Sequence, residues 1–111
     1  MPKNVLILGG EGMLGQMVRR VLFRQEKLTV KSTYYEHTPD SLWFNIENGI
    51  EELREILEQQ KSFDYVINCI GIISSSINEN DTKSVRRSIL INALFPHELA
   101  KLAQEIGVRV I

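Results

Sequence analysis

The sequence predicts an α/β fold in which helices cover a doubly wound parallel sheet. Short apolar runs alternate with segments whose apolar residues recur at helical spacing. Strands that alternate with helices are typical of βαβ units, which build parallel sheets through right-handed crossovers. A chain of 111 residues can bury one core and is too short for two. We therefore treat residues 1–111 as a single domain.

Five strands and three helices are expected. The strands are residues 3–8, 28–34, 42–44, 65–70 and 108–111. The first helix covers 13–26, and its apolar residues are expected to face the sheet: Leu14, Met17, Val18, Val21 and Leu22. The second covers about 49–60. The third is long, ends at Gly107, and is expected to align on one face Val85, Ile89, Ala93, Pro96, Ala100 and Ala103. Residues 37–41 have the composition of a turn.

The most informative stretch joins the first strand to the first helix. Gly9, Gly12 and Gly15 follow the apolar run 5–8 with the spacing G-x-x-G-x-x-G. In such a turn the first glycine permits a tight bend, the second admits a pyrophosphate and the third lets the helix pack closely. The N–H groups and the dipole at the start of a helix also favour an anion. This setting predicts a Rossmann-type nucleotide-binding domain, and a purely structural turn is the alternative.

Ligands of such sheets bind at the carboxyl ends of the strands, where the strand order reverses. This rule selects residues from three segments. Glu11, Gly12, Met13 and Leu14 would lie against the pyrophosphate of a dinucleotide. The end of the second strand, Tyr34 and Tyr35, would face the adenosine ribose, and Cys69, Ile70 and Gly71 would pass beneath the nicotinamide.

Three other residue types invite chemical hypotheses. A thiol on a buried strand usually acts as a small apolar side chain, so Cys69 is not expected to be a nucleophile. His37 and His97 have no ligand partner at useful spacing, so no metal site is expected. Pro96 has no N–H and deprives the Asn92 carbonyl of its helical partner. Asn92 would then hold a water or a ligand, or the helix would simply be kinked and solvated; the sequence leaves both open.

Composition narrows the classes of partner. The net charge is −1, which gives no reason to expect binding to nucleic acid or to a membrane surface. The single cysteine cannot form an internal disulfide, which fits a reducing compartment. The apolar run near the N-terminus is too short for a signal peptide or a membrane span. A cytoplasmic location is therefore the expectation.

Four segments are similar to a known family: residues 6–15, 44–46, 64–71 and 91–100. With them the chain resembles the N-terminal part of the extended short-chain dehydrogenase/reductases, especially sugar-nucleotide reductases of the dTDP-4-dehydrorhamnose reductase type. The resemblance implies that NAD or NADP is the cofactor and that residues 68–71 flank it. It also implies that Asn45 and Ile46 lie near the adenine and that Asn92 lies in the helix behind the active site. Asn45 stands where the family usually has an acidic residue.

The function that the resemblance implies is hydride transfer from a nicotinamide cofactor to a keto-sugar nucleotide. A dinucleotide-sensing module without catalysis and a sugar-nucleotide epimerase of the same family are the alternatives. Members of the family carry a Ser/Thr and a Tyr-x-x-x-Lys pair after the fifth strand, where this chain ends. No catalytic residue is therefore assigned, and these 111 residues alone are expected to be inactive. The sheet is expected to be truncated at its fifth strand, which would leave apolar surface bare and favour self-association.

The choice between NAD and NADP is expected to be weak. The second strand ends in Tyr34 and Tyr35, which supply neither a carboxylate for a ribose diol nor an arginine for a 2′-phosphate. Glu36 would reach the ribose or be solvated. Dissociation constants for the two cofactors are expected to lie within about tenfold of each other, or about 1.4 kcal/mol.

Overall fold

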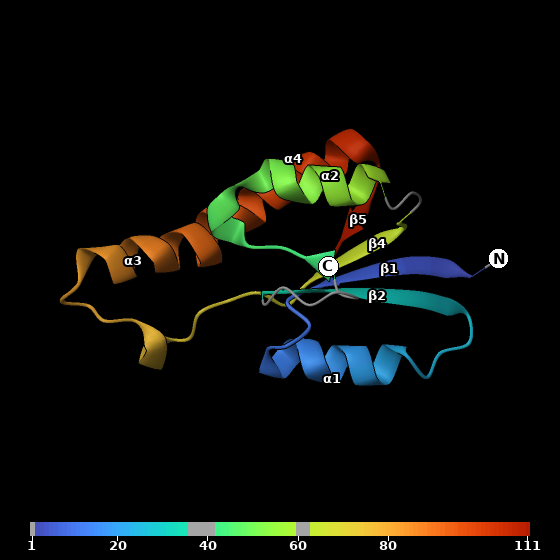
Figure 1. Cartoon of the computed structure of the whole chain (residues 1–111), viewed down its shortest axis with the longest axis horizontal. Helices are drawn as coiled ribbons and strands as arrows, with labels where there is room; N and C mark the ends of the chain where they lie inside the picture. Colours follow the sequence, from blue (N-terminus) through green and yellow to red (C-terminus); the bar gives the residue numbers. More distant parts are fainter. Residues whose placement is uncertain (1, 36–41, 60–62) are drawn as a thin grey trace.

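The protein forms a five-stranded parallel sheet flanked by helices (Figure 1). The computed structural model describes residues 2–35, 42–59 and 63–111. Its strands are β1 (Lys3–Leu8), β2 (Leu28–Tyr34), β3 (Leu42–Trp43), β4 (Tyr65–Asn68) and β5 (Arg109–Val110). Its α-helices are α1 (Met13–Leu22), α2 (Ile50–Gln59), α3 (Thr82–Ile89) and α4 (Phe95–Ile106). The expected turn at 37–41 lies outside the described residues.

The strand order β3-β2-β1-β4-β5 places β1 at the centre of the sheet. The chain runs from β1 outward to β2 and β3, then returns to pair β4 on the other side of β1. Val5 is the Cα partner of Val30 in β2 and of Tyr65 in β4. The strand order therefore reverses between β1 and β4, which is where a doubly wound sheet binds its ligand. The Rossmann-type fold predicted from the sequence is confirmed.

The core fills the space between the sheet and the α2–α4 layer. Figure 1 shows α2 and α4 on one face of the sheet and α1 on the other. Leu6, Leu53, Phe95 and Leu99 are at most 1% exposed and belong to one apolar cluster. Burying one such side chain contributes roughly 1.5–3 kcal/mol.

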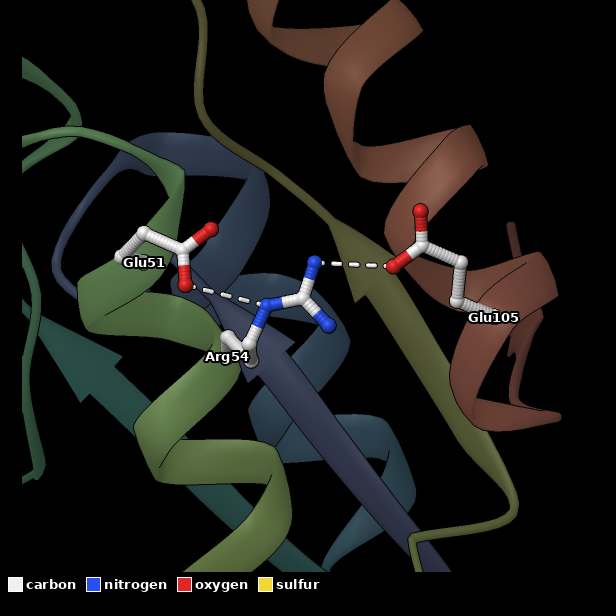
Figure 2. Close-up of polar contacts among 3 residues, drawn as sticks. All are labelled: Glu51, Arg54 and Glu105. Atoms are coloured by element: carbon white, nitrogen blue, oxygen red, sulfur yellow. Dashed lines mark hydrogen bonds and ion pairs between the residues drawn. The ribbon is translucent and has the colours of Figure 1, made fainter.

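An arginine ties the two helices of this layer together at their surface. Arg54 of α2 donates from Nε to Glu51 at 3.0 Å and from Nη2 to Glu105 of α4 at 2.8 Å (Figure 2). The hydrogen bond to Glu105 is the main cause that raises the pKa of the Arg54 guanidinium. Because these groups are partly or fully in solvent, the contact between Arg54 and Glu105 contributes little to the stability of the fold and serves mainly to align α2 with α4.

Helix α1 corrects two expectations. It ends at Leu22 instead of residue 26, because the chain tightens there into bonds such as Gln25 N–H to the Leu22 carbonyl at 3.0 Å. Its apolar residues also do not all face the sheet: Leu14, Met17 and Val21 are 60%, 52% and 53% exposed. Gly15 alone in this helix is buried, because its close approach to the glycine turn fixes which face lies inward.

The long helix expected up to Gly107 is interrupted just before Pro96. Between α3 and α4, residues Leu90–Leu94 form a π-helical turn in which the Phe95 N–H bonds to the Leu90 carbonyl. The wider turn rotates the buried face, which runs through Ile91, Phe95, Leu99 and Leu102. Of the face expected from one continuous helix, Ala103 is buried and Ile89 is 57% exposed. Gly107 ends α4 in the left-handed conformation, as predicted.

None of the helices in the described residues has the length and apolar character needed to cross a lipid bilayer.

Candidate functional site

The glycine turn between β1 and α1 is tied to the end of β2. The Gly9 N–H donates to Thr33 Oγ1 at 3.1 Å, and the Gly10 N–H donates to the Thr33 carbonyl at 2.8 Å. Gly9 has a φ of +80°, a backbone angle that residues other than glycine rarely adopt. These contacts hold the turn at the carboxyl edge of the sheet, beside the reversal of strand order.

Gly12 and Gly15 differ in what surrounds them. A Cβ at Gly15 would lie 1.9 Å from the Gly9 carbonyl oxygen, so the helix can approach the turn only with glycine there. A Cβ at Gly12 would meet only that same oxygen, at 3.7 Å, which is an ordinary contact. Gly12 also has an ordinary extended backbone, with φ −71° and ψ 168°. Steric contacts within the fold therefore do not require a glycine at position 12.

The start of α1 is suited to an anion. Gly12 is the N-cap residue, and it provides no side chain to bond the first N–H groups. The first turn of a helix leaves its N–H groups without partners inside the helix, and its dipole favours negative charge. Gly12, Met13 and Leu14 all line a cleft of about 730 Å³ at this end of the helix. A pyrophosphate is the kind of group that this arrangement binds.

The opposite wall of the cleft is the chain that follows β4. Cys69, Ile70 and Gly71 line it, together with Ile72 and Ile73. The strand ends at Asn68, earlier than expected, and the Asn68 side chain accepts a hydrogen bond from the Ile70 N–H at 3.1 Å. Residues expected beneath the nicotinamide therefore lie in a loop that faces the glycine turn.

Asn92 holds this loop from the π-helical turn. Its Oδ1 accepts from the Ile72 N–H at 2.8 Å, and its Nδ2 donates to the Ile72 carbonyl at 2.8 Å. Asn92 also lines the cleft. The sequence left open whether its amide holds a ligand or is solvated, and in the structure the amide bonds both backbone groups of one loop residue. π-Helical turns are frequent at functional sites.

A second, smaller cavity of about 70 Å³ lies at the end of β2. Glu11 and Tyr35 line it with Asn45, Ile46 and Phe44. The Asn45 side chain already accepts from the Glu47 N–H at 2.9 Å, as the cap of a short 3₁₀ turn, Ile46–Asn48. The residues expected at the ribose and the adenine thus meet at this cavity, with one exception.

That exception is Tyr34, which lines neither cavity. Arg19 of α1 donates a hydrogen bond to the Tyr34 hydroxyl, and its guanidinium lies 5.4 Å from the centre of the ring. Tyr34 therefore contacts α1. Glu36, the other residue considered for the ribose, lies outside the described residues.

Sequence reasoning missed Arg87, which lines both cavities. Its Nε donates to Glu47 Oε1 at 2.6 Å across the gap between α3 and the 3₁₀ turn. Helical periodicity marks Arg87 only as a charged surface residue, so no local signal could have placed it here. It brings a positive charge to the site of an expected anion.

Cys69 is half-buried on the wall of the cleft, and burial raises the pKa of its thiol. A raised pKa lowers the thiolate fraction at neutral pH, and the thiolate is the nucleophile. This environment disfavours a nucleophilic role for Cys69.

Comparison with known proteins finds likeness in structure only: no family model matches the sequence, and no curated protein matches it. A short-chain dehydrogenase from Leptospira borgpetersenii with bound NAD⁺ superposes with a TM-score of 0.69 at 23% identity, over 92% of this chain and 44% of its own. An ElxO variant with bound NADPH gives 0.68 at 21%, over 99% and 54%. ADP-L-glycero-D-manno-heptose-6-epimerase from Helicobacter pylori gives 0.73 at 15%, over 98% and 38%.

The chain has the fold of short-chain dehydrogenases. It spans about half or less of the length of these neighbours. At these identities the likeness concerns the fold, and the chemistry must be argued from the site.

Proposed function

We propose that this chain binds a nicotinamide dinucleotide, NAD or NADP, as the nucleotide-binding part of a reductase that acts on a keto-sugar nucleotide. The observation that carries the proposal is Gly12: it opens onto the cleft at the start of α1, and nothing in the fold requires a glycine there. Structural neighbours that hold NAD⁺ and NADPH support the same cofactor class.

Each wall of the cleft would have its own task. The first N–H groups of α1, at Met13 and Leu14, would bind the pyrophosphate, with Gly12 leaving room for it. The loop of Cys69, Ile70 and Gly71 would support the nicotinamide, and Asn92 would fix the position of that loop through Ile72. When bound, the cofactor would supply the hydride, while the protein positions it and shields it from water.

The substrate class is supported by the resemblance to sugar-nucleotide reductases and by one neighbour whose name is that of an ADP-heptose epimerase. The same neighbour favours a sugar-nucleotide epimerase as the second candidate. The two activities differ in their balance of electrons: a reductase consumes one reduced cofactor for each carbonyl it reduces, whereas an epimerase returns the hydride to its substrate. Loss of NAD(P)H absorbance in step with product would support the reductase and exclude the epimerase.

Substitution at Gly12 tests the cofactor site directly. We expect Gly12→Val to weaken NADH binding at least about tenfold, or about 1.4 kcal/mol, because its side chain would fill the space of the pyrophosphate. The unfolding midpoint should fall less than in Gly15→Ala, because a Cβ at position 12 meets no close neighbour and only the N-cap preference for Gly over Val is lost. Fluorescence titration of NADH and thermal unfolding measure the two effects.

Gly15→Ala provides the contrasting variant in the same turn. Its Cβ would overlap the Gly9 carbonyl oxygen, so it should lower the unfolding midpoint. Equal NADH affinities for the wild type and a folded Gly12→Val would contradict the proposed site. Failure of the folded wild type to bind either cofactor would contradict the proposed function as a whole.

A further inference from the structure

Tyrosines stand where a dinucleotide-binding sheet usually has an acidic residue, and Glu36 comes one position later in the sequence. In such sheets a carboxylate about 20 residues after the glycines, at the end of the second strand, bonds the ribose hydroxyls of NAD. In this chain Tyr35 stands at that place, just after β2. Neither Tyr34 nor Tyr35 carries a carboxylate, which is why the sequence predicts weak selectivity between the cofactors.

A carboxylate reaches the end of β2 from a different segment. The Tyr35 N–H donates to both carboxylate oxygens of Glu11, at 2.8 and 2.7 Å. Glu11 belongs to the glycine turn, and its own carbonyl accepts from Gln16 Nε2 at 2.7 Å. Glu11 and Tyr35 line the small cavity together with Asn45. The side chain thus lies against the backbone of the residue whose place it takes.

We propose that the Glu11 carboxylate binds the adenosine ribose of the dinucleotide and selects a free 2′-hydroxyl over a 2′-phosphate. This inference rests on the proposed function, and it assigns Glu11 to the ribose instead of the pyrophosphate. A carboxylate offers about four lone-pair sites, so one N–H leaves capacity for two hydroxyl donors. A phosphate monoester has no such donors to spare at neutral pH, and its charge of about −1.5 to −2 would be repelled.

Two arginines are the nearest candidates to attract a 2′-phosphate, and each already has another partner in the structure. Arg19 bonds the Tyr34 hydroxyl and lies over its ring. Arg87 is paired with Glu47 at 2.6 Å. A 2′-phosphate would have to compete with the Glu47 carboxylate for Arg87, whereas a ribose diol needs no cation.

The test compares NADH and NADPH binding by fluorescence titration of the 111-residue chain and its variants. We expect the wild type to bind NADH at least about tenfold more tightly than NADPH, or about 1.4 kcal/mol. Glu11→Gln keeps an oxygen for the Tyr35 N–H but removes the charge, so the fold should be kept. It should bring the two affinities within about threefold of each other, chiefly by improving NADPH binding. Glu58→Gln, the same change on the exposed side of α2, should leave the preference unaltered.

Every outcome decides the inference. A loss of preference in Glu11→Gln alone supports it. A wild type that binds both cofactors equally, or that prefers NADPH, overturns it while the proposed function stands. An unaltered preference in Glu11→Gln overturns it too, as does a loss of preference in Glu36→Gln but not in Glu11→Gln. A folded wild type that binds neither cofactor overturns this inference together with the proposed function.

Discussion

Two glycines of one turn show how much a single residue position can reveal. Gly15 is explained by the protein itself, since any Cβ would overlap the Gly9 carbonyl. Gly12 has room for a side chain, and the proposed cofactor site gives a reason for the glycine there, because a pyrophosphate would approach its backbone. The spacing of the glycines alone could not separate these roles. The surroundings of each Cβ distinguish a glycine that packing requires from one that packing does not require.

Cys69 permits a prediction about pH at the same scale. Burial raises the pKa of its thiol, so the folded protein favours the protonated form. We expect alkylation of Cys69 to be slow at neutral pH and to rise with a midpoint above that of a free cysteine, about 8.5. The corresponding stability is fully present below the pKa of the unfolded chain and is lost as pH rises through the folded pKa. Rates of iodoacetamide labelling across pH measure the shift.

The chain provides its own references for that experiment. Cys69 is its single cysteine, so Cys69→Ser should abolish labelling and give the background. The same chain unfolded in urea should titrate at the ordinary value. A folded midpoint at or below that value would show an activated thiol and would reopen the question of a nucleophile.

At the scale of elements, local patterns predicted what local patterns control. The apolar runs of β1 and β4, the glycine turn and the Gly107 cap follow from neighbouring residues, and the structure has them. The inward face of α1 depends instead on how closely Gly15 approaches the turn. The extra residue of the π-helical turn rotates the faces of α3 relative to those of α4. Glu11 and Arg87 come to the site through contacts 24 and 40 residues away along the chain, which no short pattern contains.

The π-helical turn and the loop after β4 act as one unit, and Asn92 joins them. We expect Asn92→Leu to release both backbone groups of Ile72, to lower NADH affinity about tenfold and to cost about 1 kcal/mol of stability. Hydrogen exchange at the Ile72 amide should quicken, because its acceptor is removed. Asn80→Leu, the same change in an exposed loop, is the control and should leave all three measurements unchanged. Unaltered protection of Ile72 would show that Asn92 does not hold the loop.

At the scale of the whole molecule, the two faces of the sheet are covered unequally. α2 and α4 cover one face, and α1 lies on the other (Figure 1). The main apolar cluster lies on the α2–α4 side and includes Leu53 and Leu57 from α2 and Leu99 from α4. On the other side, α1 presents large apolar side chains to solvent, and at the sheet edge Val110 of β5 and the following Ile111 are exposed. Exposed apolar side chains that gather into a patch usually mark a place where another surface packs.

Because the two faces of the sheet are covered unequally, we expect these 111 residues to self-associate through the outer face of α1. Met17 and Val21 lie one helical turn apart there and are each about half exposed, with Phe23 59% exposed just beyond them. β5 offers only two residues of strand, too short an edge to hold a second sheet firmly. We expect the mass measured by light scattering to rise with concentration, and Met17→Gln combined with Val21→Gln to suppress the rise. Val110→Gln should suppress it less. If Val110→Gln disperses the protein and the α1 variant does not, association runs through the sheet edge, as the sequence alone suggested. A measured mass that stays equal to that of the monomer at every concentration would mean that the exposed face of α1 does not drive association.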